Sequence, residues 1–201
     1  NLGMKVLFFD TSEKLALGNA KKCKNLGELL KQSDVITVHV DGRKNNANLI
    51  GEPEFRKMKA GVIFLNLSRG FVVDLDSLAR NIKEKKINGA AIDVFPKEPR
   101  SNGEEFKSIL RGLPNVILTP HIAGSTEEAQ RNIGEFVSQR LINYIDSGAT
   151  ILSVNFPALD LTSFKKSHRL IYIHANTPGV LAKFNGILAK YKINVPDRQL
   201  A

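Results

Sequence analysis

Short apolar runs alternate along the first part of the chain with segments of helical periodicity. The apolar runs, each bounded by turn-forming residues, lie at residues 4–10, 34–40, 61–67, 87–95 and 115–120. Among the segments between them, residues 74–85 form an amphipathic helical pattern with Asp74 placed to cap it. Apolar strands without polar alternation, separated by helices, are typical of a parallel sheet covered on both faces. The pattern predicts a doubly wound α/β domain, which binds ligands at the carboxyl ends of its strands.

The pattern changes after residue 120. Residues 125–145 begin with the capping pair Ser125 and Glu128 and continue as one long helix, which completes a predicted first domain at residues 1–146. Residues 147–167 are polar and interrupted by proline, so we expect a connector.

The last segment starts as a second domain. Residues 168–175 predict a strand, residues 177–191 a helix and residues 192–195 another strand. Because a β-α-β beginning cannot bury both of its faces alone, we expect residues 168–201 to be a truncated domain.

Composition restricts the class of protein. The 201 residues are 42% hydrophobic and 24% charged, which is typical of a globular protein. No apolar run approaches the roughly 18 residues of a membrane-spanning helix, and no signal peptide is visible, so we expect a cytoplasmic location without membrane association. The single Cys23 argues against a disulfide framework and a thiol-based metal site.

A formal net charge of +9 raises the question of nucleic-acid binding. The basic residues are scattered over short tracts at 21–24, 83–86 and 164–169, and no stacking aromatics are interleaved with them. We therefore expect no nucleic-acid partner, and the basic surface equally favours an anionic small-molecule substrate.

Ionisable residues lie at the ends of four predicted strands: Asp10, Arg69, Asp93 with Glu98, and His121. This set suits hydride transfer on a 2-hydroxy acid. An imidazole can accept the hydroxyl proton near neutral pH, an adjacent carboxylate can stabilise its cation, and a guanidinium can bind a substrate carboxylate through two hydrogen bonds. Singly, four of these residues also permit a structural interpretation: Asp10 as a helix cap, Arg69 as a surface ion pair, Glu98 as a solvated turn and His121 as a residue that only packs a turn.

Three sequence blocks carry a resemblance to a known family. "NLSRGFVVDLDSL", "GAAIDVFPKEP" and "NVILTPHIAGSTEEAQ" resemble the signatures of the NAD-dependent D-isomer 2-hydroxyacid dehydrogenases. "SVNFP" and "HANTPGVL" narrow the resemblance to members that oxidise 3-phosphoglycerate in the first step of L-serine biosynthesis and end in a ferredoxin-like ACT domain. The resemblance implies NAD as cofactor, a homo-oligomer, and reduction of 2-oxoglutarate as a further activity.

The same resemblance assigns site residues. Arg69, Glu98 and His121 match the catalytic residues; Asp10 matches the ribose-binding acid, which implies NAD rather than NADP; and Asp93 is expected to face the nicotinamide carboxamide. The residues expected to line the cofactor are Asp10, Leu67, Ser68, Arg69, Asp93, His121, Ala123 and Gly124.

Residues 168–201 resemble the start of an ACT module. In serine-inhibited members the effector is held by a His-x-Asn pair and a later Asn, which match His174, Asn176 and Asn194. L-serine is therefore a candidate effector, although Asn176 could instead cap a helix beginning at Thr177.

One family feature has no counterpart in the sequence. No G-x-G-x-x-G loop is present, and residues 1–10 match the segment that follows this loop in the family. We therefore expect an internal fragment: a partial Rossmann-like sheet lacking its first strand and Gly-rich loop, followed by a truncated ACT domain. Because that loop binds the pyrophosphate, the fragment alone is expected to bind NAD weakly and to be inactive.

Three alternatives stay open. A glyoxylate or hydroxypyruvate reductase of the same family would lack the ACT segment. A non-catalytic NAD(H)-sensing protein would lack it as well. A stand-alone serine-binding module would not need Arg69, Glu98 and His121.

Overall fold

The computed structural model describes residues 3–101, 103–160 and 168–199. It divides into two compact units with the boundary between Ile122 and Ala123, and each unit is described by itself. The long helix that we assigned to the first domain groups with the second unit. The predicted domain limits at 146 and 167 remain predictions, and residues 161–167 of the predicted connector lie outside the described residues.

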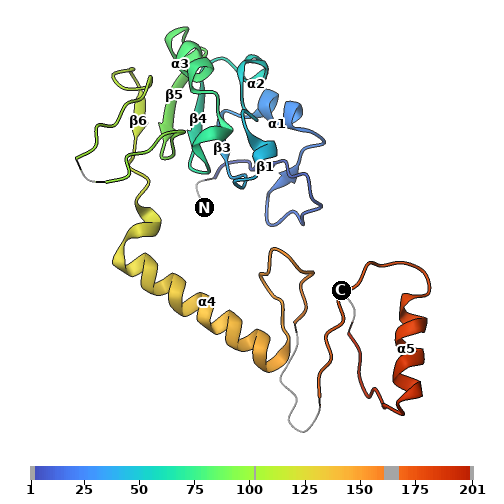
Figure 1. The fold of residues 1–201 in the computed structure, drawn as a ribbon. Helices are drawn as coiled ribbons and strands as arrows, with labels where there is room; N and C mark the ends of the chain where they lie inside the picture. Colours follow the sequence, from blue (N-terminus) through green and yellow to red (C-terminus); the bar gives the residue numbers. More distant parts are fainter. Residues whose placement is uncertain (1–2, 102, 161–167, 200–201) are drawn as a thin grey trace. The chain divides into compact units, whose positions relative to one another are not determined.

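A four-stranded parallel sheet in the order β3-β4-β5-β6 forms the centre of the first unit (Figure 1). Its strands are β3 (Val35–Val38), β4 (Val62–Asn66), β5 (Ile87–Ile92) and β6 (Val116–Leu118). Asn66 pairs with Ile92, and Ile92 pairs with Leu118. Because the strands are parallel and in register, the loops that follow β4, β5 and β6 leave the sheet at one edge.

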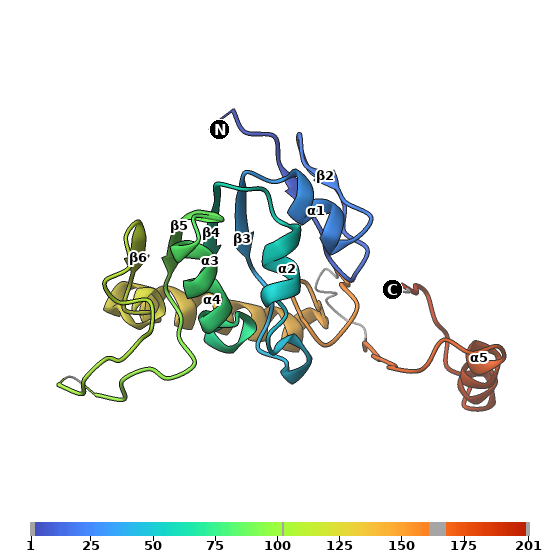
Figure 2. The same cartoon turned by 90° about the horizontal axis from the view of Figure 1, so that it is seen from above.

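Three helices, α1 (Leu26–Gln32), α2 (Glu52–Lys57) and α3 (Leu75–Lys83), pack on one face of this sheet (Figure 2). Phe55 of α2 and Phe64 of β4 are fully buried there and meet edge to face, with ring centroids 5.5 Å apart. Burial of such apolar side chains supplies most of the favourable free energy of this α/β layer.

The first unit supplies helices to one face of the sheet only. On the other face Val35 and Ile63 are each 44% exposed and Ile117 is 64% exposed. We predicted helices on both faces of the sheet, but the described residues of this unit place helices on one face alone. Because only one face is packed, buried and exposed positions alternate along β3 and β4.

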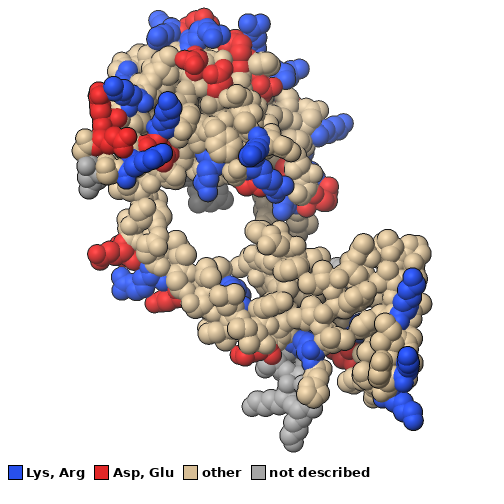
Figure 3. All heavy atoms as spheres, viewed as in Figure 1, with Lys and Arg blue, Asp and Glu red and all other residues tan. Residues whose placement is uncertain are grey.

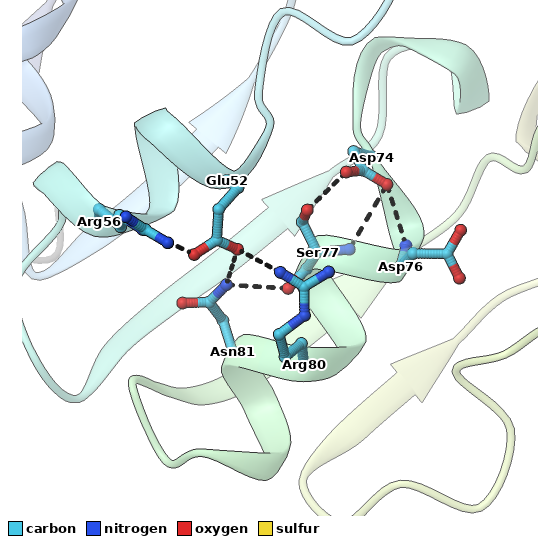
Figure 4. A network of polar contacts seen from close by, with 7 residues as sticks. All are labelled: Glu52, Arg56, Asp74, Asp76, Ser77, Arg80 and Asn81. Carbon is cyan, nitrogen blue, oxygen red and sulfur yellow. Dashed lines mark hydrogen bonds and ion pairs between the residues drawn. The ribbon is translucent and has the colours of Figure 1, made fainter.

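A polar network links α2 to α3 (Figure 4). The carboxylate of Glu52 accepts hydrogen bonds from Arg56 at 2.9 Å, Arg80 at 3.2 Å and Asn81 at 3.1 Å. At the start of α3 the predicted cap is confirmed, because Asp74 accepts hydrogen bonds from the N–H groups of the first turn.

The first predicted strand lies outside the four-stranded sheet. It is shortened to β1 (Leu7–Phe8), which pairs in parallel with β2 (Lys21–Lys22) in a separate two-stranded sheet. In a doubly wound domain the second and fourth strands flank the first strand. The described residues of this chain provide no strand at that central position, so no hydrogen-bonded ladder joins β1 to β3.

The second unit contains the 3-10 turn η3 (Ala123–Ser125) and two helices, α4 (Glu127–Ser147) and α5 (Val180–Lys190). Thr126, rather than Ser125, caps α4 by accepting the N–H of Ala129. The helix ends at Gly148, whose φ of +74° is the left-handed conformation that glycine adopts without strain.

Two predicted strands of the second unit are not formed. Residues 168–175 and 192–195 have no β-ladder partner among the described residues, and a strand is defined by that pairing. The truncated ACT module therefore remains a prediction. Within the described ranges, no helix combines the length and the apolar character that crossing a bilayer requires.

Candidate active site

The turn after β4 is fixed from inside the protein by Asn66. This side chain is fully buried, and its Oδ1 accepts hydrogen bonds from the N–H and the hydroxyl of Ser68 at 3.1 and 2.9 Å. Its Nδ2 donates to the carbonyl of Arg69 at 3.1 Å. Sequence reasoning did not single out Asn66, although an amide at an inward-facing position of an apolar strand is a signal for such a role.

Gly70 brings the turn that carries Arg69 against the loop after β5. A Cβ at this glycine would lie 2.0 Å from the carbonyl carbon of Phe95 and 2.5 Å from the nitrogen of Pro96. Only a residue without a side chain allows this approach of two backbones. The loop that carries Arg69 and the loop that carries Glu98 are thus in direct contact.

The Arg69 side chain itself is exposed, with few protein partners. Its Nη1 donates to the carbonyl of Ser68 at 2.7 Å, and Gly42 of the loop after β3 packs beside its Nε. In the described part of the chain no carboxylate pairs with it, so the surface ion pair that we considered from the sequence is not formed. The guanidinium keeps most of its donors for a ligand.

His121 and Glu98 meet at this edge of the sheet. Nδ1 of His121 lies 3.1 and 3.0 Å from the two carboxylate oxygens of Glu98, and the two side chains are 40% and 36% exposed. Among the described residues, Nε2 of His121 has no hydrogen-bond partner. A carboxylate on one ring nitrogen orients the imidazole and leaves the other nitrogen for proton transfer. The contact between these two residues, inferred from sequence, is present.

The ionisation of Glu98 follows from its partners. Burial raises its pKa, but the N–H of Phe95, 2.9 Å from Oε1, and the hydrogen bond with His121 act in the opposite direction and leave the pKa below its ordinary value. Glu98 is therefore a carboxylate at neutral pH, and a charged partner can stabilise an imidazolium.

Asp93 follows β5 and contacts the segment after β6. Its Oδ1 accepts hydrogen bonds from the hydroxyl of Thr119 at 2.5 Å and from the backbone N–H of His121 at 3.1 Å. Oδ2 has no hydrogen-bond partner within the described ranges. One carboxylate oxygen of Asp93 thus accepts hydrogen bonds from within the protein, and the other remains available to a ligand.

The other predicted cofactor-lining residues are more scattered. Leu67 is half exposed, whereas Ser68 is buried and directs its hydroxyl to Asn66. Ala123 and Gly124 lie in η3, within the second unit. These assignments remain predictions.

The predicted convergence of Asp10 with the other strand ends does not hold. Asp10 follows β1, which belongs to the separate two-stranded sheet, so it shares no sheet edge with His121. Its Oδ1 accepts the N–H of Ser12 at 2.7 Å, and the other oxygen is not used by a described residue. Arg69, Asp93, Glu98 and His121 therefore lie on the loops at one edge of the four-stranded sheet, and Asp10 does not.

The predicted effector residues lie in the second unit. The ring of His174 stacks on Tyr172, with centroids 4.8 Å apart, and its Nδ1 is 2.9 Å from the carbonyl of Ala175. Asn176 and Asn194 are exposed. The alternative role of Asn176 as a helix cap is wrong, because α5 begins after Gly179.

Charge is spread over the surface of the first unit. In the view of Figure 3, Lys and Arg side chains alternate with Asp and Glu side chains, and no continuous basic face forms. Several basic residues form ion pairs with acidic side chains; Lys59, for example, lies 2.8 Å from the carboxylate of Asp34. This distribution gives no support to a nucleic-acid surface on the face shown.

Comparison with known proteins identifies the family. Residues 1–123, which correspond to the first unit, match the family model of the "D-isomer specific 2-hydroxyacid dehydrogenase, NAD binding domain". The chain belongs to the D-isomer specific 2-hydroxyacid dehydrogenase family. The Rossmann-like parallel α/β fold predicted from the sequence is therefore confirmed.

Three similar proteins extend this finding. D-3-phosphoglycerate dehydrogenase of Haemophilus influenzae is 48% identical over 100% of this chain and 49% of its own length. The protein of that name from Escherichia coli K12 is 46% identical, over 100% and 48%. The crystal structure of D-lactate dehydrogenase from Aquifex aeolicus, complexed with NAD and lactic acid, has a TM-score of 0.58 and 35% identity over 71% of this chain and 46% of that one. The chain thus spans about half the length of the curated relatives it matches.

Proposed function

We propose that the intact protein oxidises 3-phosphoglycerate to 3-phosphohydroxypyruvate with NAD, the reaction that its relatives' names describe and that opens L-serine synthesis. The observation that carries this proposal is the contact of His121 Nδ1 with the Glu98 carboxylate at 3.0 Å, on the loop edge that also bears Arg69. Nε2 of His121 accepts the proton of the substrate hydroxyl as the carbonyl forms, and Glu98 stabilises the resulting imidazolium. In the reverse direction His121 returns the proton.

Arg69 binds the substrate carboxylate and polarises the carbon–oxygen bond next to it. Within the described part of the chain, one nitrogen of its exposed guanidinium has a hydrogen-bond partner, the carbonyl of Ser68. A planar guanidinium forms paired hydrogen bonds with a carboxylate. This role selects 2-hydroxy and 2-oxo acids as a class.

The residues at the rim suit a dinucleotide. Bound NAD would supply the hydride acceptor: the substrate would lose a hydride from the carbon that bears the hydroxyl and a proton from the hydroxyl itself, which leaves the carbonyl. The open Oδ2 of Asp93 can accept hydrogen bonds from a carboxamide. Asp10 lies away from this rim, beside the separate β1–β2 sheet; the oxygen that Ser12 does not use could accept hydrogen bonds from ribose hydroxyls, and its charge would repel a 2′-phosphate. Leu67, Ser68, Ala123 and Gly124 are proposed as further cofactor-binding residues on the strength of the family resemblance alone.

Three finer features belong to the same proposal. L-serine would act as an inhibitor through His174, Asn176 and Asn194 on an ACT module, 2-oxoglutarate would serve as an additional substrate, and the protein would be a homo-oligomer. Identity of 48% to a D-3-phosphoglycerate dehydrogenase over the whole chain supports the serine pathway over a glyoxylate or hydroxypyruvate reductase.

The experiment is a substrate comparison on the purified intact protein. NADH oxidation is followed with 3-phosphohydroxypyruvate, 2-oxoglutarate, hydroxypyruvate and glyoxylate, with and without L-serine. We expect the largest kcat/KM with 3-phosphohydroxypyruvate. A larger value with glyoxylate or hydroxypyruvate would reassign the substrate within the family, and no NADH oxidation with any of the four would reject the catalytic proposal.

A further inference from the structure

Thr119 connects two parts of the candidate site that are far apart in sequence. It follows β6 and lies two residues before His121, and its own N–H donates to the carbonyl of Ile92 at 3.0 Å. Its hydroxyl donates to Oδ1 of Asp93 at 2.5 Å. The side chain is exposed, so it adds little to the apolar core.

His121 has an unusual backbone conformation that needs such support. Its φ is +53°, in the left-handed region that residues with a Cβ rarely adopt. The N–H of His121 donates to the same Oδ1 of Asp93 at 3.1 Å. One carboxylate oxygen therefore binds both Thr119 and the strained residue that carries the imidazole.

The shared oxygen makes the orientation of Asp93 dependent on Thr119. A carboxylate turns easily about its terminal bond, and a second donor on Oδ1 restricts that rotation. The β-branched side chain of Thr119 is itself restricted in χ1 and so holds its hydroxyl in place. Without this donor, Asp93 could turn Oδ1 away from the N–H of His121.

We infer that Thr119 is a positioning residue for His121, which it holds toward Glu98 through the carboxylate of Asp93. The inference rests on the proposed function as far as catalysis is concerned, because only an acid–base His121 gives this geometry a kinetic consequence. The contact itself does not depend on the reaction.

The test compares Thr119→Val with Thr119→Ser in the intact protein. Valine keeps the shape and loses the donor, whereas serine keeps the donor. We expect Thr119→Val to lower kcat for reduction of 3-phosphohydroxypyruvate about tenfold, the rate equivalent of one lost hydrogen bond. Thr119→Ser should restore most of it, and the unfolding midpoint should stay close to that of the wild type in both.

A matched control is Thr37→Val. Thr37 is also exposed, lies on β3 and contacts a histidine ring, Nε2 of His39, at 2.9 Å. Loss of the Thr37 hydroxyl in Thr37→Val should leave kcat unchanged. Wild-type kcat in Thr119→Val, or equal losses in Thr119→Val and Thr119→Ser, would overturn the inference.

A second measurement separates this inference from the proposed function. Amide hydrogen exchange at His121, read by NMR or mass spectrometry, should be faster in Thr119→Val than in the wild type and normal in Thr119→Ser. If the wild type fails to oxidise NADH, the proposed function fails while the exchange result still decides whether Thr119 holds His121. Unchanged exchange in Thr119→Val would reject the inference even in an active enzyme.

Discussion

The first unit contains two polar clusters that differ in how their hydrogen bonds are used. In one, around Glu52 between α2 and α3, both oxygens of the central carboxylate are engaged, one by Arg56 and the other by Arg80 and Asn81 (Figure 4). The other lies on the loops after β4, β5 and β6. There the Nε2 of His121 and the Oδ2 of Asp93 are not used by described residues, while neighbouring atoms of the same side chains are fixed.

This difference distinguishes a cluster that stabilises the fold from one that can bind a ligand. A carboxylate whose two oxygens are both engaged by donors of the protein stabilises the fold and has little to offer a ligand. A cluster that fixes one atom of each side chain and leaves the other open is preorganised for binding, because orientation is set before the ligand arrives. By this criterion the loop edge, not the α2–α3 network, is the better candidate for the active site.

The largest expected effect comes from removing the imidazole of the open cluster. His121→Asn keeps a residue that tolerates a positive φ but cannot take a proton, and we expect kcat to fall by about 10²–10⁴-fold. His39→Asn, at an exposed histidine of the same unit, is the control and should leave kcat unchanged. If kcat of His121→Asn stayed within a few-fold of the wild type, the cluster at the loop edge could not be the catalytic one.

Much of the first unit follows from sequence because its signals are local. The apolar runs predicted β3 to β6, and the capping aspartate predicted the start of α3. The positions of Glu98 and His121 after predicted strands indicated that the two side chains lie close together. The parallel arrangement then brings such strand ends to one edge whatever the intervening loops do.

The missed features depend on pairing or on contacts between loops. Asp10 follows a strand end, but its strand pairs only with β2, and no local pattern reveals that. The Thr119–Asp93 contact joins residues 26 apart. The predicted cap of α4, Ser125, is one residue away from the observed cap, Thr126, because either hydroxyl can accept a hydrogen bond from a first-turn N–H group.

A smaller effect is expected in the α2–α3 network, to which Asp74 is joined through Ser77 and Asn81, and it should appear in stability alone. Asp74→Ala removes the acceptor of the first N–H groups of α3, which costs about 1 kcal/mol of unfolding free energy for a typical cap. Asp74→Asn, which retains an acceptor, should recover most of the loss. Chemical denaturation measures both, and kcat should be unchanged; a fall in kcat without a loss of stability would place this network in the catalytic machinery.

The smallest effect is a pH dependence of stability at Glu98. Its pKa is lowered in the folded protein, since the hydrogen bonds from Phe95 and His121 outweigh burial, so its stabilisation is present above the ordinary pKa of 4.5 and is lost as pH falls through the lowered value. Glu98→Gln should therefore be less stable than the wild type at neutral pH, and this difference should shrink toward zero as the pH is lowered below the ordinary pKa of a glutamate. Glu105→Gln, which breaks only an exposed ion pair with Lys107 at 3.1 Å, should change the unfolding midpoint little at either pH. A stability difference for Glu98→Gln that grew on acidification would mean that the carboxyl, not the carboxylate, is the form that holds His121.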